Sequence, residues 1–147
     1  MNKLSFSILG LLFLMNGCTC SSIRKNQYQD KAEAESVIQD FYRLLDLHDS
    51  SRLASLFSRN FFKVVDTPQF FSQLNAFNND LGTIDSISLE NWETNIVEGI
   101  SSTTSRYIFK YAVKRQKYKA TETFNLEKEN GKVKIWGYHI DNAKPIH

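Results

Sequence analysis

Hydrophobic residues recur at two different spacings along this chain, and the change between them divides it into two parts. Between Asp30 and Gly82 the apolar positions repeat every three or four residues, as in amphipathic helices. From Thr83 onward apolar and polar positions alternate, as in strands with one buried face. Helices followed by strands predict an α+β domain, with helices packed on one face of a curved antiparallel sheet.

Three helices are predicted in the first part. The first covers residues 30–49, and Asp30 and Glu33 have the spacing of a capping box. The second is short, covers residues 50–58 and has Ser50 as its N-cap. The helical spacing predicts these inward residues: Ala34, Val37, Ile38, Phe41, Leu44, Leu45, His48, Leu53, Leu56 and Phe57. Residues 61–65 are expected to form a short strand or a packing loop.

The third predicted helix covers residues 67–81. Thr67 is its expected N-cap, Pro68 its first helical residue, and Gly82 lies just past its end, which is the usual asymmetry of helix ends. Its apolar stripe consists of Phe70, Phe71, Leu74, Phe77 and Leu81.

About four antiparallel strands are predicted after Thr83. In the first, the apolar face changes sides near Glu90 and Asn91, which indicates a bulge. A turn at Gly99 leads to strands over residues 104–114, 117–127 and 132–140. Their predicted inward residues are Tyr107, Phe109, Tyr111, Val113, Tyr118, Ala120, Glu122, Phe124 and Leu126.

Two turns set the predicted strand registers. A two-residue turn at Arg115 and Gln116 would place Tyr107 opposite Phe124 and Tyr111 opposite Ala120, so that both apolar faces coincide. A three-residue loop at residues 129–131, with a bulge at the glycine, would place Phe124 opposite Trp136 and Glu122 opposite Tyr138.

The N-terminus has the pattern of a secretory signal. Lys3 precedes an apolar run from Leu4 to Met15, which would form about 18 Å of helix. A bilayer core requires about twenty apolar residues, so this run is short for a membrane span. A positive start, a short apolar run and a small residue before a cleavage site are typical of a signal peptide.

The cleavage site resembles the lipobox of bacterial lipoproteins, in the residues Leu14-Met15-Asn16-Gly17-Cys18. The resemblance implies that residues 1–17 are removed and that Cys18 is lipidated. It also implies a lipid anchor in a bacterial membrane, on the periplasmic face of the outer membrane if the source has two membranes. An ordinary N-terminal helix and a plain secretory signal are the alternatives, and the role of Cys20 stays open.

The organisation expected from these patterns has four parts. Residues 1–17 are the signal, 18–29 the lipidated cysteine and a polar tether, 30–142 a single domain and 143–147 a frayed tail. Lys3 is the one charged side chain in the signal, so the mature 130 residues keep 17 basic and 16 acidic side chains. A net charge near +1 does not favour binding to nucleic acid.

Residue chemistry narrows the function further. Cys18 and Cys20 are the two cysteines of the chain, and they lie too close together to form a disulfide scaffold. His48, His139 and His147 do not have the spacing of metal ligands, and no phosphate-binding loop is present in the sequence. We therefore expect neither a metal nor a cofactor.

The predicted order of a helix, a short helix, a third helix and a long bent sheet resembles the nuclear transport factor 2-like superfamily, and within it small bacterial envelope proteins of unknown function. The resemblance is carried by "TETF" at Thr121–Phe124 and "NGKVKIWGYHI" at Asn130–Ile140, and it extends over residues 31–142. It implies a cone-shaped fold in which a sheet curls around helices and leaves a pocket at its open end. Some members are isomerases or dehydratases that use a pocket carboxylate, whereas others only bind partners.

Glu122 is the best candidate for a functional residue, because it is the one charge on an otherwise apolar strand face. Beside Tyr138 it could act as a base in proton transfer. A hydrogen-bonded structural pair is the interpretation that we favour, since buried charges usually have structural partners. Trp92, Tyr107 and Tyr111 are candidates for lining the same pocket, and core packing is their alternative role.

A second candidate surface is a basic hairpin on the opposite face, formed by Arg106, Lys110, Lys114, Lys117 and Lys119. It could meet anionic headgroups. A solvated sheet face, with lysines that discourage edge pairing, is the interpretation that we favour, because the overall charge is nearly balanced.

Three functions remain open at this point. The first is a membrane-anchored, non-enzymatic module that binds a protein partner or a small apolar ligand. The second is a small pocket enzyme with Glu122 as its base, and the third is an inhibitor or immunity-like partner protein. A homodimer through the sheet also stays open.

Overall fold

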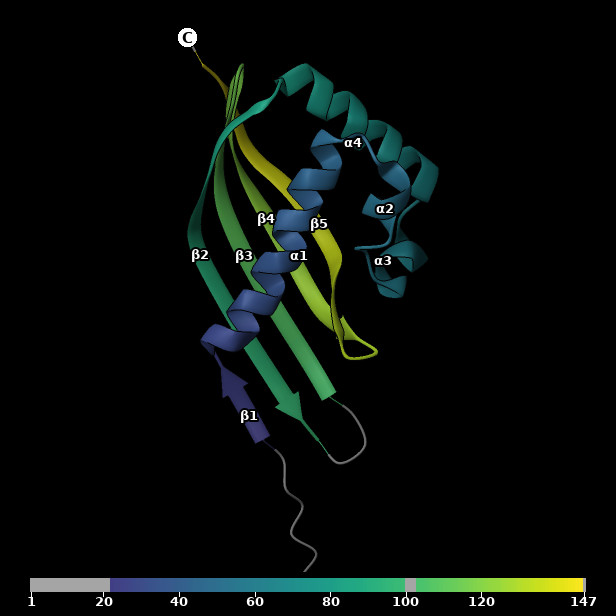
Figure 1. Ribbon diagram of the computed structural model, residues 1–147, viewed down its shortest axis with the longest axis vertical. Coiled ribbons are helices and arrows are strands. Elements are labelled where there is room, and N and C mark those ends of the chain that lie inside the picture. Colours follow the sequence, from purple (N-terminus) through teal and green to yellow (C-terminus); the bar gives the residue numbers. More distant parts are fainter. Residues whose placement is uncertain (1–21, 100–102, 147) are drawn as a thin grey trace, which may run out of the picture.

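Five antiparallel strands lie side by side in the order in which they occur along the chain. The computed structural model describes residues 22–99 and 103–146. The strands are β1 (Ser22–Lys25), β2 (Ile84–Glu98), β3 (Thr103–Arg115), β4 (Tyr118–Glu129) and β5 (Lys132–Pro145). The predicted α+β class with a curved antiparallel sheet is confirmed, but the sheet has five strands rather than four (Figure 1).

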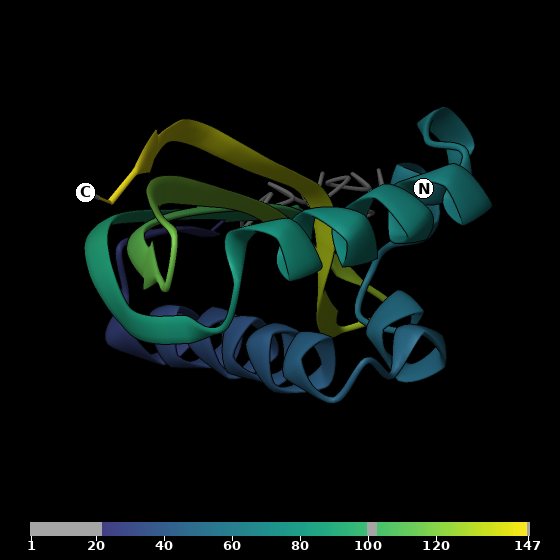
Figure 2. The same cartoon turned by 90° about the horizontal axis from the view of Figure 1, so that it is seen from above.

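Four helices are found among the described residues: α1 (Tyr28–Asp46), α2 (Ser50–Ala54), α3 (Arg59–Val64) and α4 (Thr67–Leu81). Seen from above, the strands curl around α1, which runs along the concave side of the sheet (Figure 2). α4 lies beside β5, and Phe70 and Phe77 of α4 line a cleft together with Tyr138 and Ile140 of β5. The helices therefore cover the inner face of the sheet and leave its outer face open.

The described domain extends further at both of its ends than predicted. β1 lies inside the predicted tether and pairs with β2, Ser22 opposite Glu98 and Lys25 opposite Asn95. β5 continues into the predicted tail as far as Pro145, and the amide of Ile146 donates to the Lys117 carbonyl at 2.9 Å. Backbone pairing holds both segments, and four residues such as Ser22–Lys25 are too few to show an apolar alternation.

The helix boundaries shift because a stronger capping residue lies one position earlier. Asp49 caps α2 by accepting from the Arg52 amide at 3.0 Å, where Ser50 was predicted. Asp66 caps α4 by accepting from the Gln69 amide at 2.9 Å, where Thr67 was predicted. In both helices an aspartate precedes the predicted serine or threonine, and its carboxylate accepts the capping hydrogen bond instead.

Two predictions for the first half of the chain are wrong. Residues 61–65 were expected to be a strand or loop, but Arg59–Val64 is α3, capped by the Ser58 hydroxyl, which accepts from the Phe61 amide at 3.3 Å. His48 was expected on the buried face of the first helix, but it is exposed and has a φ of 53°. It follows the C-cap of α1 in a Schellman turn, in which the Asp49 amide donates to the Leu44 carbonyl at 3.0 Å.

The start of α1 also differs from the prediction, because the predicted capping box does not form there. The helix begins at Tyr28, and its N-cap Gln27 makes no side-chain cap. Asp30 therefore lies inside the first turn, where it is buried and pairs with Arg24 at 3.4 Å.

The β3–β4 hairpin turns one residue later than predicted. Arg115 belongs to β3 and the turn is at Gln116 and Lys117, so Tyr111 faces Glu122 and Tyr107 faces Leu126. The pairing is shifted by two residues from the predicted register. Because side chains alternate with a period of two, each residue keeps its predicted face.

The β4–β5 hairpin has a two-residue turn rather than a three-residue loop. Asn130 and Gly131 both have positive φ, 52° and 76°, as the tight Asn-Gly hairpin turn requires. One bulge lies further along, between the pairs Leu126–Ile135 and Asn125–Gly137, and a second register shift lies between Lys119 and Thr121. Trp136 is the extra residue and is 42% exposed, so its predicted inward position is wrong. The predicted bulge near Glu90 is confirmed.

The core is aromatic and centres on Phe41 of α1. Its ring lies 4.9 Å from that of Tyr138, 5.0 Å from that of Phe124 and 6.2 Å from that of Phe57, so it joins α1 to β4, to β5 and to the segment between α2 and α3. Of the predicted α4 stripe, Phe71, Leu74 and Leu81 are buried, whereas Phe70 and Phe77 are half-buried.

Phe41→Ala should lower the free energy of unfolding by about 3–5 kcal/mol, because it removes a fully buried ring from the centre of the core. Urea titration followed by circular dichroism measures this change. The control is Val64→Ala, at an exposed position of α3, with an expected change below about 0.5 kcal/mol. Equal losses for the two variants would contradict the central position of Phe41.

Candidate functional site

The side chain of Glu122 lies where four elements meet. The alternation of β4 turns it inward, beside Tyr138 of β5 and Arg115 at the end of β3, while Tyr42 of α1 approaches from the helical layer. Glu122 is 0% exposed. The predicted contact between Glu122 and Tyr138 inside the domain is confirmed, although Tyr138 is opposite Phe124 and Glu122 is opposite Ile140.

Three donors surround the carboxylate. The Tyr138 hydroxyl donates to Oε2 at 2.7 Å and the Tyr42 hydroxyl donates to the same oxygen at 3.0 Å. Arg115 Nη2 donates to Oε1 at 3.0 Å, and the two charged side chains are only 2% and 0% exposed. Arg115 Nη1 also donates to Asn78 Oδ1 of α4 at 2.7 Å, which links a fifth element to the cluster.

The two phenols remain protonated in this environment. Burial raises the pKa of Tyr138 well above its ordinary value of 10.0, and the negative charge of Glu122 raises it further. Burial and the same carboxylate also raise the pKa of Tyr42, with Arg115 acting in the opposite direction. Both hydroxyls are therefore permanent hydrogen-bond donors to Glu122 at neutral pH.

A cleft lies next to this cluster, but Glu122 does not form part of its wall. The cleft has a volume of about 260 Å³, runs between α4 and β5, and is lined by Phe70, Gln73, Leu74, Phe77, Tyr138 and Ile140. Tyr138 separates the cleft from the carboxylate. A substrate in the cleft would have to displace the Tyr138 hydroxyl to reach Glu122, so this geometry favours the structural pair over a catalytic base.

The other predicted pocket residues are placed elsewhere. Tyr107 is fully buried, and burial raises its pKa. Tyr111 adjoins the cluster, with its ring 6.3 Å from that of Tyr42, and burial raises its pKa as well. Trp92 is half-buried near the start of α1, 6.1 Å from Tyr28. None of the three lines the cleft beside Tyr138.

Two residues that bind Glu122 were missed in the sequence. Arg115 was assigned to a turn, but the alternation through Tyr111 and Val113 continues to it once β3 is extended by one residue. Tyr42 follows Ile38 by four residues, so the helical spacing could have placed it on the buried face. Neither signal indicates that these side chains meet Glu122, which is 80 residues from Tyr42.

Other features of the described residues limit the chemistry. In residues 22–99 and 103–146, no group of three or more His, Cys, Asp or Glu side chains could hold a metal ion. No helix in these ranges is long and apolar enough to cross a bilayer. Arg106, Lys110, Lys114, Lys117 and Lys119 are exposed, and Cys18 and Cys20 lie outside the described residues.

Protein families, curated proteins and solved structures give no significant match to the chain.

Glu122→Gln should lower the free energy of unfolding by about 3–5 kcal/mol, because it leaves the buried guanidinium of Arg115 without a counter-charge. Adding Arg115→Met should restore much of that loss, since it removes the unpaired charge. Urea titration measures both changes, and Glu93→Gln on the exposed surface is the control. A loss below about 1 kcal/mol for Glu122→Gln would contradict a tightly paired cluster.

The phenols should make the protein sensitive to alkali. Since the folded-state pKa values of Tyr42 and Tyr138 lie above 10.0, the unfolded chain releases these protons first, and the free energy of unfolding falls as pH rises through about 10. Unfolding measured from about pH 8 to 11 should show this decline, and combining Tyr42→Phe with Tyr138→Phe should make it less steep. If stability declines as steeply in the double variant as in the unsubstituted protein, both phenols ionise at the same pH in the folded and the unfolded protein.

Proposed function

We propose that this chain is a bacterial lipoprotein whose single α+β domain is a non-enzymatic interaction module held at a membrane of the cell envelope. The observation that carries the proposal is Gly17-Cys18 at the end of the apolar run, followed after only three intervening residues by β1. An anchor at Cys18 would therefore join the ordered domain almost directly.

The length of the connection limits where the domain can lie. The four steps from Cys18 to Ser22 span at most about 14 Å, so the β1 end of the domain would stay close to the membrane surface. A long polar tether would instead let the domain sample many orientations.

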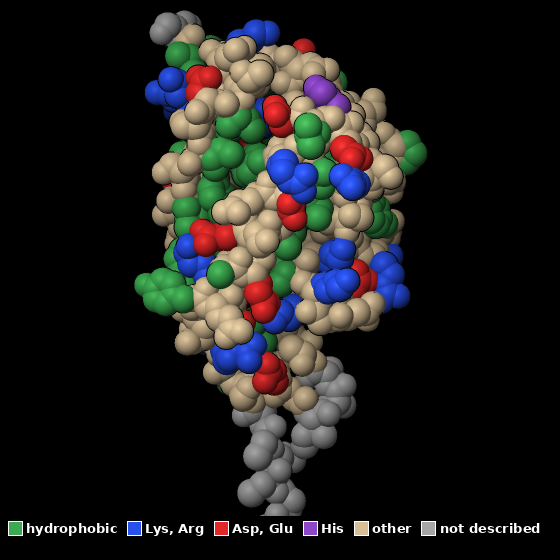
Figure 3. Space-filling model, viewed as in Figure 1, with side chains coloured by type: hydrophobic (Ala, Val, Ile, Leu, Met, Phe, Trp, Pro, Cys, Tyr) green, Lys and Arg blue, Asp and Glu red, His purple; other side chains and the backbone are tan. Residues whose placement is uncertain are grey.

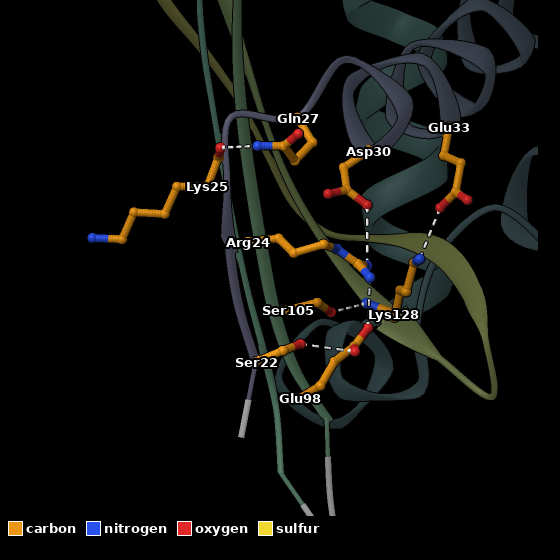
Figure 4. A network of polar contacts seen from close by, with 9 residues as sticks. All are labelled: Ser22, Arg24, Lys25, Gln27, Asp30, Glu33, Glu98, Ser105 and Lys128. Carbon is orange, nitrogen blue, oxygen red and sulfur yellow. Dashed lines mark hydrogen bonds and ion pairs between the residues drawn. The ribbon is translucent and has the colours of Figure 1, made fainter. Parts of the chain in front are cut away.

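Polar contacts fasten β1 to the rest of the domain (Figure 4). Arg24 forms ion pairs with Glu98 of β2 at 2.8 Å and with Asp30 of α1 at 3.4 Å. The Ser22 hydroxyl also donates to Glu98, at 3.0 Å. The first described residues after Cys18 are thus tied to both the sheet and the helix, which supports a fixed orientation of the domain at the membrane.

The internal geometry supports binding rather than catalysis. The carboxylate of Glu122 is enclosed by Tyr42, Tyr138 and Arg115, so an isomerase or dehydratase reaction would first require the cluster to open. The helices on a curved sheet are compatible with the nuclear transport factor 2-like cone, and we include membership of that superfamily in the proposal. Because such folds serve both enzymes and binding proteins, the closed site guides our choice between them.

Two kinds of interaction fit this proposal. A protein partner, including the target of an inhibitor or immunity-like protein, would dock on the outer surface or on a sheet edge. A small apolar ligand would enter the cleft between α4 and β5, which is lined mainly by aromatic and aliphatic side chains.

Cys18→Ser should release the protein from the membrane fraction and abolish incorporation of labelled fatty acid, because the thiol that carries the lipid is lost. Fractionation and metabolic labelling in a bacterial host measure these effects. Cys20→Ser is the matched control and should leave both unchanged. Labelling that persists in Cys18→Ser, or is lost in Cys20→Ser, would refute the assignment of Cys18.

A further inference from the structure

One edge of the sheet is paired along only part of its length. β1 covers β2 from Asn95 to Glu98, and Asn26 extends this pairing to Thr94 through two hydrogen bonds of 2.9 Å. In the described part of the chain, no strand pairs with the outer side of β2 from Ile84 to Glu93. Figure 1 shows this bare edge directly above β1.

The backbone groups on the free edge belong to the residues that face inward. The Thr94 amide and carbonyl both point toward Asn26, away from β3, and the Thr94 side chain faces inward. Since backbone and side-chain directions alternate with the same period of two, Trp92 has the same orientation. Beyond the bulge, Leu89 and Ile87 face Tyr111 and Val113, so their amides and carbonyls also point to the free edge.

An apolar hollow accompanies these groups. Ile87 is on the inner face of the sheet yet is 39% exposed, and Leu89 and Trp92 are only half-buried. Figure 3 shows hydrophobic side chains gathered in a hollow along β2 beside α1. A strand added to this edge would direct every second side chain into that hollow.

The charge of β2 indicates what kind of strand would fit. β2 contains four acidic residues and no lysine or arginine. Asp85 and Glu98 have basic partners, Lys114 at 3.7 Å and Arg24 at 2.8 Å. Glu90 and Glu93 are exposed and form no ion pair with the described residues, although Glu90 also lines a hollow on the outer face together with Lys119 and Lys144.

On the inner side of the β2 edge, the positive charge of the nearest lysine is balanced by a carboxylate. Lys31 lies 5.8 Å from the centre of the Trp92 ring, and it is paired with Glu35 at 2.6 Å. A second copy of β2 would place like charges opposite one another, which disfavours pairing of two such edges. Lys110 and Arg106 are exposed one strand further in, opposite Asn91 and Asn95. On β2 itself the unpaired charges are Glu90 and Glu93, and these complement a basic segment.

We propose that the free edge of β2 accepts an extended basic peptide of a partner protein as a sixth strand, with apolar side chains at alternate positions in the hollow along Ile87, Leu89 and Trp92. The backbone of the peptide pairs with these three residues, and its basic side chains lie near Glu90 and Glu93. This inference rests on the proposed role as an interaction module, and it specifies the surface and the partner chemistry. It does not depend on lipidation of Cys18.

The test uses the full chain, purified in non-denaturing detergent, and an eight-residue peptide of alternating valine and lysine. Binding is followed through Trp92 fluorescence in a Trp136→Phe background, because Trp136 is on the outer face of β5. We expect saturable binding that is at least about tenfold tighter than that of a peptide with the four valines and four lysines in separate blocks. A peptide N-methylated on its edge-facing amides should bind at least about tenfold more weakly than the unmodified one.

Two variants locate the site. Ile87→Pro removes an amide that points to the free edge and is not needed for pairing with β3, so it should weaken binding about tenfold or more without unfolding the sheet. Combining Glu90→Lys with Glu93→Lys should weaken binding of the valine–lysine peptide and permit binding of an alternating valine–glutamate peptide. The charge reversal keeps the test decisive if the proline variant fails to fold.

Several outcomes would overturn the inference. Equal binding of the alternating and block peptides, or of the N-methylated peptide, would mean nonspecific adhesion without strand pairing. Unchanged affinity in the charge-reversed variant would place the peptide elsewhere. Self-association of the chain that is seen by sedimentation and abolished by Ile87→Pro would make a second copy the occupant. Membrane release of Cys18→Ser is measured separately, so failure of one proposal leaves the other intact.

Discussion

The ion pair between Glu122 and Arg115 is the interaction on which the arrangement of the elements depends. Two charges removed from water cost less when they pair with each other and when other groups satisfy their remaining hydrogen-bonding atoms. Here Tyr42 from α1, Tyr138 from β5 and Asn78 from α4 are such partners, whereas Arg115 Nε is buried without a partner among the described residues. A shift of any one of these elements would leave a buried polar group unpaired, so the cluster selects one packing of the helices on the sheet.

The sequence predicts the class and the faces of most elements because burial follows their periods. The α1 residues Ile38, Phe41 and Leu45 are buried at the expected helical spacing. In β3 and β4 the predicted inward faces are correct even though the register differs by two residues, since such a shift preserves the alternation. Boundaries and turns are predicted less well, because neighbouring residues such as Asp66 and Thr67 can each form the same cap.

The sequence pattern predicts only part of the candidate site. The predicted loop and the observed turn place the extra residue of the β4–β5 hairpin at different points, Gly131 and Trp136. Both arrangements direct Tyr138 inward, and Glu122 faces the interior in either case. The alternation therefore finds these two residues, although it assigns Trp136 to the wrong face. Arg115 and Tyr42 complete the cluster through contacts between elements, and no local pattern in the sequence specifies such contacts.

Both edges of the sheet are covered over part of their length, and the position of the cover bears on function. The segment before α3 pairs with β5 only at Ile135, where the Ser58 amide donates to the Ile135 carbonyl at 2.8 Å and the Ile135 amide donates to the Leu56 carbonyl at 2.9 Å. On the opposite side, β1 covers β2 only at the end of the domain where the anchor would attach. The uncovered part of β2 continues from there away from Ser22, the first described residue. An anchored domain would thus hold its free edge beyond the membrane-proximal strand, where a partner can reach it without competing with the lipid surface.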